Sequence, residues 1–245
     1  LIESPEGSYQ YDAENRMVRA TVNSKTTSFQ YDGEGRRIRK SSELENRVYI
    51  YAMDGSLIAE YEASSTSASL KKEYIYGESG LVATVEVEAG AVEKIDYITS
   101  DHLSSPRLIT SQNAEVVSRR DFYPFGGQIS STVGGRAAIE GYSTTDSLRH
   151  KFTTYERDDE TGLDFAQARY YGSLAGRFIS PDPVTLTYTR MFDPQQFNLY
   201  TYTRNSPLIL TDPTGLDFQF VGKDGDKFVD DFNSRDKAQF KVKLN

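Results

Sequence analysis

The stretch SYQYDAENRMVRA at residues 8–20 is followed twenty residues later by SFQYDGEGRRIRK at residues 28–40. Both segments run aromatic-Gln-Tyr-Asp, then a short turn rich in Gly, Asn and Glu, then alternating basic and apolar residues. Looser copies follow as VYIYAMDGSLIAEY (48–61) and EYIYGESGLVATV (73–85). The repeat predicts that each copy is a strand, a tight turn and a returning strand.

The residues within a copy alternate with the period of two that a sheet with one packed face requires. Asp54-Gly55 is a strong hairpin signal, because both residue types tolerate positive φ. One hairpin cannot bury its apolar face alone, whereas stacked hairpins can. We therefore predict an all-β fold, with YD-type hairpins wound as a curved, continuous antiparallel sheet and at most short helices. The alternative is an ordinary β-sandwich whose turns resemble one another by chance.

Composition sets outer limits on function. The chain has 245 residues, no cysteine and a formal net charge of −8. The acidic balance argues against a broad nucleic-acid interface, and the lack of cysteine excludes disulfides, thiolate catalysis and cysteine-bound metals. No apolar run approaches the roughly 20 residues of a membrane-spanning helix. Residue 1 is Leu and no signal sequence opens the chain, so we expect the natural N-terminus to lie elsewhere.

Two polar segments and one basic run interrupt the repeats. Residues 62–72 (EASSTSASLKK) are predicted to form a long exposed hairpin tip, and residues 128–149 a surface excursion. The basic run GRRIRK at 35–40 is expected on a repeat strand, with opposite charges on neighbouring strands balancing it.

Three longer motifs follow the repeats in order. Residues 96–127 contain Asp-His-Leu, then Pro-Arg-Leu, and close on Asp-Phe-Tyr-Pro-Phe-Gly. Residues 151–183 read KFTTYERDDETGLDFAQARYYGSLAGRFISPDP, and residues 197–216 read FNLYTYTRNSPLILTDPTGL.

Together with the upstream repeats, these motifs resemble the core of rearrangement hotspot (Rhs) YD-repeat proteins across roughly residues 8–216. Teneurins and the C-component of ABC toxin complexes share this architecture. The resemblance implies a hollow β-shell with an inward-spiralling plug, and a variable C-terminal segment held inside. It implies three parts: YD-repeat strands at 1–95, the Rhs-associated core at 96–216, and the start of a variable segment at 217–245. Only 29 residues (217–245) follow Leu216, too few for an ordinary enzyme toxin.

The resemblance also implies a self-cleavage site. The matching residues are Asp182 and Asp212 as a catalytic pair, with Arg177 as their basic partner and Leu216–Asp217 as the scissile bond. One carboxylate of a close pair holds a proton, so the ionised one activates water and the protonated one polarises the scissile carbonyl. Pro213 and Gly215 would shape the turn that presents Leu216, with positive φ at Gly215.

Each of these residues also fits a plainer role. Asp182 and Asp212 both precede Pro, as turn residues commonly do, and Arg177 fits a solvated strand charge or a structural ion pair. His102 follows Asp101 in what matches a strand segment of the family, so a structural role is expected for it. The acidic stretch 222–231 (GKDGDKFVDD) lacks the full spacing of a calcium loop and is expected to be a turn. No metal or cofactor is expected.

The function that the sequence predicts is therefore a secreted or cell-surface bacterial shell that releases a polymorphic toxin or other cargo by aspartic self-cleavage. Its expected partners are its own C-terminal segment, other shell components and a secretion apparatus, with no nucleic acid and no membrane span. The alternative is a non-cleaving extracellular interaction scaffold. A trans-acting enzyme has too few residues after Leu216 to be favoured.

Overall fold

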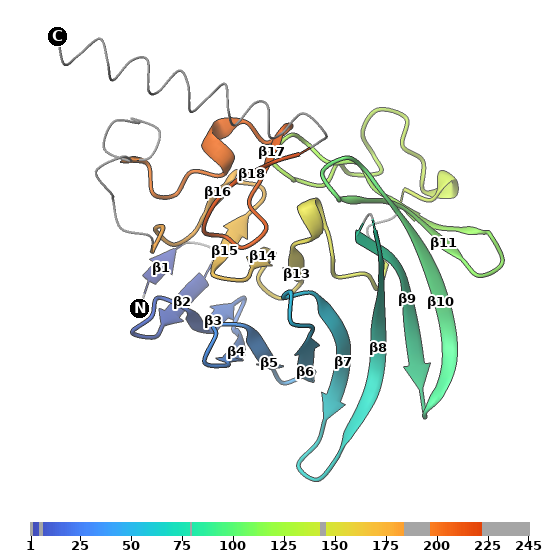
Figure 1. Ribbon diagram of the computed structural model, residues 1–245, viewed down its shortest axis with the longest axis horizontal. Coiled ribbons are helices and arrows are strands. Elements are labelled where there is room, and N and C mark those ends of the chain that lie inside the picture. Colours follow the sequence, from blue (N-terminus) through green and yellow to red (C-terminus); the bar gives the residue numbers. More distant parts are fainter. Residues whose placement is uncertain (1, 5–6, 79, 143–145, 184–196, 222–245) are drawn as a thin grey trace.

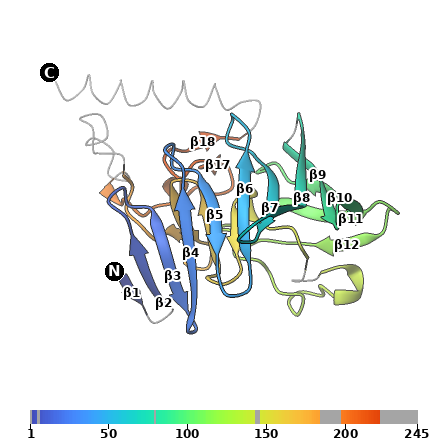
Figure 2. The same cartoon turned by 90° about the horizontal axis from the view of Figure 1, so that it is seen from below.

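The structure is a computed structural model of the chain and describes residues 2–4, 7–78, 80–142, 146–183 and 197–221. Its main element is an open sheet of twelve strands in which each strand pairs antiparallel with the next one along the chain (Figures 1 and 2). The strands are β1 (Ile2–Ser4), β2 (Gly7–Tyr11), β3 (Met17–Val22), β4 (Lys25–Tyr31), β5 (Arg37–Ser41), β6 (Asn46–Tyr51), β7 (Leu57–Ala63), β8 (Ala68–Gly77), β9 (Gly80–Glu88), β10 (Ala91–Ser100), β11 (Pro106–Ser111) and β12 (Val116–Arg119).

A shared turn joins the strands of each YD hairpin. In the first copy, Oδ1 of Asp12 accepts the backbone N–H groups of Glu14 and Arg16, at 3.0 and 2.9 Å. Oδ1 of Asp32 accepts the equivalent pair in the second copy, at the same two distances. The aspartate therefore satisfies donors that the five-residue loop leaves unpaired, which explains why Asp follows Tyr in the repeat.

The same turn recurs at Asp101, where the sequence pattern predicted a strand. Oδ1 of Asp101 accepts the N–H groups of Leu103 and Ser105, at 3.0 and 2.9 Å. That expectation was wrong, because Asp101 and His102 lie in the loop between β10 and β11. His102 contacts the carbonyl of Leu208 through Nε2 at 3.0 Å, which ties this loop to a segment far along the chain.

The sheet curves around a set of inner elements (Figure 1). A second, four-stranded antiparallel sheet contains β13 (Glu156–Asp158), β14 (Leu163–Ala166), β15 (Arg169–Gly172) and β16 (Arg177–Phe178). A two-stranded sheet contains β17 (Leu210–Thr211) and β18 (Gln219–Phe220). Three short 3₁₀ turns complete the described elements: η1 (Ala138–Glu140), η2 (Phe152–Thr154) and η5 (Thr203–Asn205).

Apolar clusters join the inner elements to the large sheet. Tyr9, Met17 and Phe29 of the large sheet pack with Phe165 and Tyr170 of the small one. A second cluster lies between β6–β11 and Leu148. The third is almost entirely internal to the inner elements, and consists of Leu103, Phe152, Tyr155, Ala166, Tyr171, Phe178 and Tyr202. The inner elements are thus packed as a plug on one face of the curved sheet.

Buried charges cross the same interface. Arg37, on β5, is fully buried and pairs with Asp158 and Glu156 of β13. Arg149 pairs with Glu156 at 3.2 Å, with Asp158 at 3.5 Å and with Glu60 of β7 at 3.5 Å. The basic run at 35–40 is therefore balanced largely from the plug rather than from neighbouring strands, because Arg37 points to the covered face.

The predicted all-β, curved and continuous sheet is confirmed, and the β-sandwich alternative is excluded. The predicted long tip at 62–72 was wrong in extent, since β7 and β8 continue to the pair Ala63–Ala68 and leave only residues 64–67 as the turn. At Asp54-Gly55 the chain makes the five-residue loop, with positive φ at Gly55 alone.

The surface excursion at 128–149 is largely exposed where the structure describes it, but its end returns to the core at Asp146, Leu148 and Arg149. The boundary predicted after residue 95 falls inside β10, and the change from large sheet to plug comes after β12. Within the described residues, no helix is long and apolar enough to cross a membrane.

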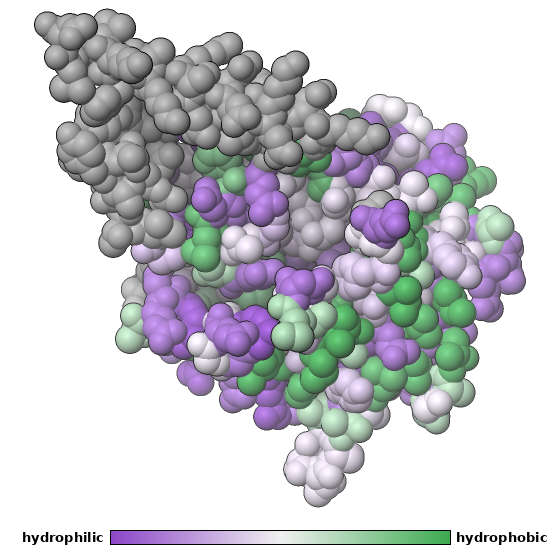
Figure 3. Space-filling model, viewed as in Figure 1, coloured by the Kyte–Doolittle hydropathy of each residue, from purple (hydrophilic) through white to green (hydrophobic). Residues whose placement is uncertain are grey.

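The face of the molecule seen in Figure 3 is divided by polarity. In the space-filling view, hydrophilic side chains dominate over β2–β5, whereas apolar side chains gather over β7–β10 (Figure 3). Exposed apolar side chains on the strands of this region include Ile58 of β7 and Ile75 of β8.

Candidate functional site

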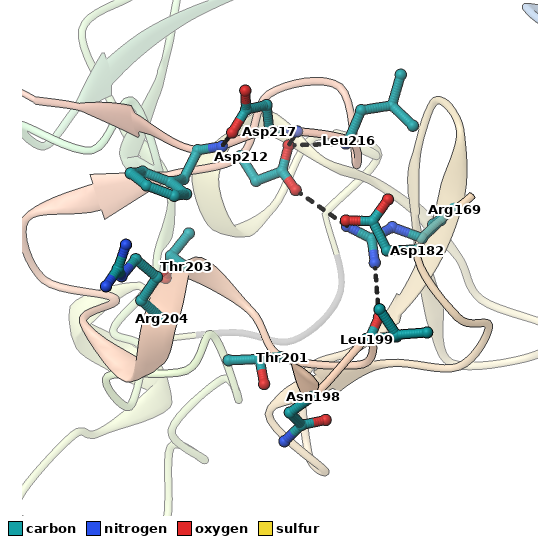
Figure 4. Close-up of a pocket in the computed structure, with 11 residues that line it drawn as sticks. Arg169, Asp182, Asn198, Leu199, Thr201, Thr203, Arg204, Asp212, Leu216 and Asp217 are labelled. Atoms are coloured by element: carbon teal, nitrogen blue, oxygen red, sulfur yellow. Dashed lines mark hydrogen bonds and ion pairs between the residues drawn. The ribbon is translucent and has the colours of Figure 1, made fainter. Parts of the chain in front are cut away.

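Asp212 directly follows β17 and is wrapped by the turn that comes after it. Its Oδ1 accepts the backbone N–H groups of Leu216 at 3.1 Å and of Asp217 at 3.2 Å (Figure 4). The residue is 3% exposed. The Asp217 nitrogen belongs to the bond that the family resemblance implies to be scissile, so this carboxyl group accepts a hydrogen bond from the nitrogen that would leave on cleavage.

Gly215 makes the wrapping possible. Its φ is +70°, in the left-handed region, which confirms the positive φ predicted for it. A Cβ at this position would lie 2.4 Å from the carbonyl oxygen of Ala166, which is closer than van der Waals contact allows. The turn is also fastened to the plug by a hydrogen bond of 3.0 Å from Ala168 N–H to the Thr214 carbonyl.

Arg169, the first residue of β15, connects the two predicted carboxylates. Its Nη2 lies 3.4 Å from Oδ2 of Asp212 and 4.0 Å from Oδ2 of Asp182 (Figure 4). Nη1 donates to the carbonyl of Leu199 at 3.1 Å, and Nε donates to the carbonyl of Gly215. The guanidinium also stacks over the ring of Phe178, 3.6 Å from its centroid. One side chain therefore fixes both carboxylates and the turn before the scissile bond.

The structure brings Asp182 and Asp212 together as predicted, since both carboxylates lie within 4.0 Å of the same guanidinium nitrogen. Asp182 donates its backbone N–H to the carbonyl of Leu199 at 2.9 Å, and its side chain is 16% exposed. A cavity of about 60 Å³ lies between them, lined by Arg169, Asp182, Asp212, Leu216, Asp217 and Phe218. A water needs about 10–15 Å³ of such space, so the cavity has room for a nucleophilic water.

Burial decides the protonation of Asp212. It raises the pKa of this carboxyl to about 6, against the opposing effects of Arg169 and of the backbone N–H groups of the turn. A carboxyl group with a pKa near 6 holds a proton often enough at neutral pH to act as an acid. The pair is therefore asymmetric, with the more enclosed carboxyl group as the natural proton carrier.

Arg177 does not take the place predicted for it. In β16 its neighbour Phe178 is fully buried, and because successive side chains alternate between the two faces of a strand, Arg177 is exposed. No ion pair joins it to Asp182 or Asp212 in the described structure, where Arg169 holds both. The expectation for Arg177 was wrong in position, and the solvated strand charge was the better interpretation.

A signal for Arg169 was present in the sequence. It stands in the run LDFAQARYYG (163–172), where every residue of β14 and β15 is buried. An arginine inside such an apolar and aromatic run has to find a buried partner of opposite charge. Asp212 and Asp182 are those partners.

The wall of the site contains backbone strain. Thr203, Arg204 and Asn205 have φ values of 42°, 54° and 59°, so three consecutive residues without glycine adopt the left-handed conformation. Such residues cost roughly 1–2 kcal/mol each, with Asn less penalised than the others. Arg204 also places its guanidinium 5.6 Å from the ring centroid of Phe218, just beyond the scissile bond. Strain of this kind persists where the surrounding structure fixes a geometry tightly.

Other predicted features contribute little to this site. Pro213 is exposed at the start of the turn. Within the described ranges no cluster of three or more side chains could hold a metal ion. The acidic stretch 222–231 lies outside the described residues.

Comparison with known proteins defines the class. The teneurin YD-shell family matches residues 1–208. The toxin subunit YenC2 of Yersinia entomophaga is 29% identical over 85% of this chain and 19% of its own length. The tRNA nuclease WapA of Bacillus subtilis is 25% identical over 87% of this chain and 8% of its own length. The crystal structure of TcdB2-TccC3 superposes with a TM-score of 0.62 at 22% identity, over 86% of this chain and 10% of that one.

The fold and the match over most of the sequence agree on a curved sheet of YD hairpins closed by a packed plug. The chain belongs to the teneurin YD-shell family, which confirms the predicted resemblance to Rhs and related YD-repeat shells. It spans less than a fifth of the length of these relatives.

Proposed function

We propose that this chain is the C-terminal part of a YD-repeat shell that cuts its own backbone after Leu216 and so frees a C-terminal cargo segment that the shell encloses. The observation that supports this most directly is the hydrogen bond from the Asp217 N–H to Asp212, with Asp182 held nearby by Arg169. Aspartic hydrolysis requires two carboxyl groups. Here one is hydrogen-bonded to the leaving nitrogen, and the second lines a cavity that can hold a water.

The geometry suggests a division of roles within the pair. Ionised Asp182 takes a proton from a water in the cavity as the water oxygen bonds to the Leu216 carbonyl carbon. Protonated Asp212 then gives its proton to the Asp217 nitrogen as the bond from that carbon to nitrogen breaks. The products are a carboxyl group on Leu216 and a free amine on Asp217. This assignment refines the sequence prediction, since the protonated carboxyl acts on the nitrogen rather than on the carbonyl oxygen.

Arg169 acts as a positioning residue in this scheme. Its guanidinium lies 4.0 Å from Asp182 and holds the turn before the scissile bond through Gly215. The reaction is intramolecular and single-turnover, so no substrate from outside the chain is involved.

The names of the relatives support a toxin-associated role. They are called a toxin subunit and a tRNA nuclease, and one TccC3 structure is described as lacking a hypervariable C-terminal region. By analogy, the segment after Leu216 would lead into a variable toxin or cargo, in a secreted or cell-surface bacterial protein. Other shell components and a secretion apparatus are its proposed partners.

The alternative function is a non-cleaving interaction scaffold on the cell surface or outside the cell. The exposed apolar side chains over β7–β10 favour it, because a contiguous apolar surface is a common feature of protein contact sites (Figure 3). In that case the Asp212 turn would serve only to close the plug.

Intact-mass spectrometry under denaturing conditions tests the proposal. The parent chain is expected as two pieces, 1–216 and 217–245, whereas Asp212→Asn and Asp182→Asn stay whole. Asp54→Asn is the matched control, because Asp54 is an exposed turn residue of the sheet and its replacement leaves the cut unchanged. A parent chain that stays whole under native folding conditions would overturn self-cleavage and leave the scaffold function.

A further inference from the structure

The chain does not leave the shell after the proposed cut. Three residues beyond Leu216 it has already returned to the plug as β18, which pairs antiparallel with β17 in the register Leu210–Phe220 and Thr211–Gln219. Val221 continues the contact, since its N–H donates to the carbonyl of Ile209 at 3.1 Å. The segment on the far side of the scissile bond is thus a strand of the plug sheet.

Side chains reinforce this pairing. Val221 is partly buried against the third apolar cluster, which includes Tyr202 and Phe178. Phe218 lies under the guanidinium of Arg204, 5.6 Å from ring centroid to carbon. None of these contacts passes through the Leu216–Asp217 bond, so all of them remain available when that bond is broken.

We propose that residues 218–221 are a docking strand that keeps the C-terminal segment bound to the plug after the chain has been cut. This inference rests on the proposed self-cleavage, and it makes cutting and release two separate steps. The occupant of the β17 edge is the beginning of the chain's own C-terminal segment, recognised by backbone pairing and by the side chain of Val221.

The chemistry of the cut adds to this retention. Hydrolysis leaves an amine on Asp217, which carries a positive charge at neutral pH. In the uncut geometry that nitrogen lies 3.2 Å from Oδ1 of Asp212, so the cut converts an amide hydrogen bond into an ion pair between the two products. Both new ends are then held, one by the turn at Gly215 and the other by β18.

The test separates the cut from the release. Denaturing mass spectrometry first establishes whether the parent chain is in two pieces, which concerns the proposed function alone. Native size-exclusion chromatography of the same sample then follows the fragment 217–245. The fragment is expected to elute with 1–216, and Val221→Asp is expected to increase its dissociation rate at least tenfold. Val133→Asp, an exposed loop change of the same chemistry, leaves the dissociation rate unchanged.

Val221→Pro adds an independent check, because it removes the N–H that donates to Ile209 while keeping an apolar side chain. It too is expected to release the fragment faster. A parent sample in which the two pieces separate at once, as fast as in Val221→Asp, would overturn the docking strand while leaving the cut established.

If the chain stays whole, hydrogen exchange tests whether residues 218–221 are paired with the plug. The amide of Val221 is expected to exchange slowly in the parent and at least tenfold faster in Val221→Asp, whereas Val133→Asp leaves it protected. Exchange of the Val221 amide at the rate of an unstructured peptide would overturn the docking strand, whatever the outcome for cleavage.

Discussion

Asp212 combines two properties that seldom occur in one aspartate. Its side chain is buried, and burial raises its pKa to about 6. Its Oδ1 also accepts a hydrogen bond from the backbone N–H of Asp217, the nitrogen of the bond after Leu216. A surface turn aspartate would be fully ionised at neutral pH and would have no proton to give. The catalytic proposal therefore depends on burial as much as on residue identity.

This pKa predicts the pH dependence of cleavage. Because the active form of Asp212 is protonated, the rate is expected to fall about tenfold for each pH unit above 6. Uncut chain held in urea would be diluted into buffers from pH 5 to 8, and the fragments counted over time by mass spectrometry. A rate that instead rises through pH 6 would show that ionised Asp212 is the base and would reverse the two roles.

Gly215→Ala tests the turn that presents the scissile bond. A left-handed φ alone costs a non-glycine residue about 1–2 kcal/mol, and the added Cβ also meets the Ala166 carbonyl oxygen. We expect a loss of at least 2 kcal/mol in the free energy of unfolding and a cleavage rate reduced tenfold or more. Urea denaturation measures the change in stability, and intact-mass spectrometry measures the extent of cleavage.

Gly35→Ala is the matched control for Gly215→Ala. Gly35 has a φ of +83° in a sheet turn, and a Cβ there meets nothing within 4 Å. It is expected to share the stability cost of the backbone conformation but to cleave at the parent rate. Equal cleavage in both variants would show that Gly215 has no part in presenting Leu216.

The two aspartates lie near each other, as the resemblance implied, but Arg169 rather than Arg177 lies beside them, and this difference has a physical cause. The two aspartates were named by the family resemblance, because the matching motifs Ser-Pro-Asp-Pro and Asp-Pro-Thr-Gly-Leu contain them. The choice between Arg169 and Arg177 depends on which face each strand turns to the core. That choice is set by the whole plug, through Phe178 and the buried β14–β15 pair.

At the scale of elements, the YD turn is a unit of structure with its own internal bonds. Asp12 and Asp32 each bind two loop N–H groups through Oδ1, and each also pairs with an arginine four residues on, at 2.8 Å. Asp101 repeats the backbone part of this arrangement where the local sequence no longer contains Tyr-Asp. The same Asp-centred turn therefore also occurs at a position of the chain that lacks the Tyr-Asp motif.

Replacing Asp32 tests how much one such turn contributes to the free energy of unfolding. Asp32→Ala removes two acceptor contacts and one ion pair, and is expected to lower the free energy of unfolding by about 1–2 kcal/mol. Asp32→Asn keeps an acceptor oxygen and should cost about half as much. Both are measured by urea denaturation in the Asp212→Asn background, where a single chain unfolds.

The exposed partner Glu34 provides the control for the turn. Glu34→Ala removes only a solvent-exposed salt bridge with Arg36, so the expected change is within about 0.5 kcal/mol. If Asp32→Ala were no more harmful than Glu34→Ala, the loop N–H groups would be satisfied by water and the aspartate would not hold the turn.

Most strands of the large sheet were predictable from the sequence. Period-two alternation and recurring turns predicted strands from residue 8 to 85, and the structure has them there. The tip at 62–72 was misjudged because small polar residues read as a loop, although cross-strand pairing carries β7 and β8 to Ala63 and Ala68. Strand length in an exposed hairpin is set by the partner strand as well as by its own composition.

At the scale of the whole molecule, the shell sheet and the plug are joined by charges as well as by apolar clusters. Arg37 reaches from β5 to Asp158 of β13 across 121 positions of sequence. Arg149 links the same carboxylate to Glu60 of β7. No local pattern could predict these pairs, because their members come from different repeats and motifs and meet only when the plug has docked.

Breaking one buried pair is therefore expected to weaken docking of the entire plug. Asp158→Asn removes one of the two carboxylates that pair with the fully buried guanidinium of Arg37, and breaking a buried ion pair costs up to about 3–5 kcal/mol. Urea denaturation in the Asp212→Asn background measures the loss. Glu93→Gln, on the exposed end of β10, is the control and is expected to change stability by less than about 0.5 kcal/mol.

The paired variant Arg37→Met with Asp158→Leu shows whether the charges stabilise the interface or only specify it. Apolar groups of similar size often replace a buried ion pair without loss, so this variant is expected to recover most of the stability lost in Asp158→Asn. Recovery would mean that the pair selects the position of the plug on the sheet. A double variant no more stable than Asp158→Asn would mean that Glu156 and Arg149 depend on Arg37 and Asp158 as one network, and that the charges themselves hold the plug on the sheet.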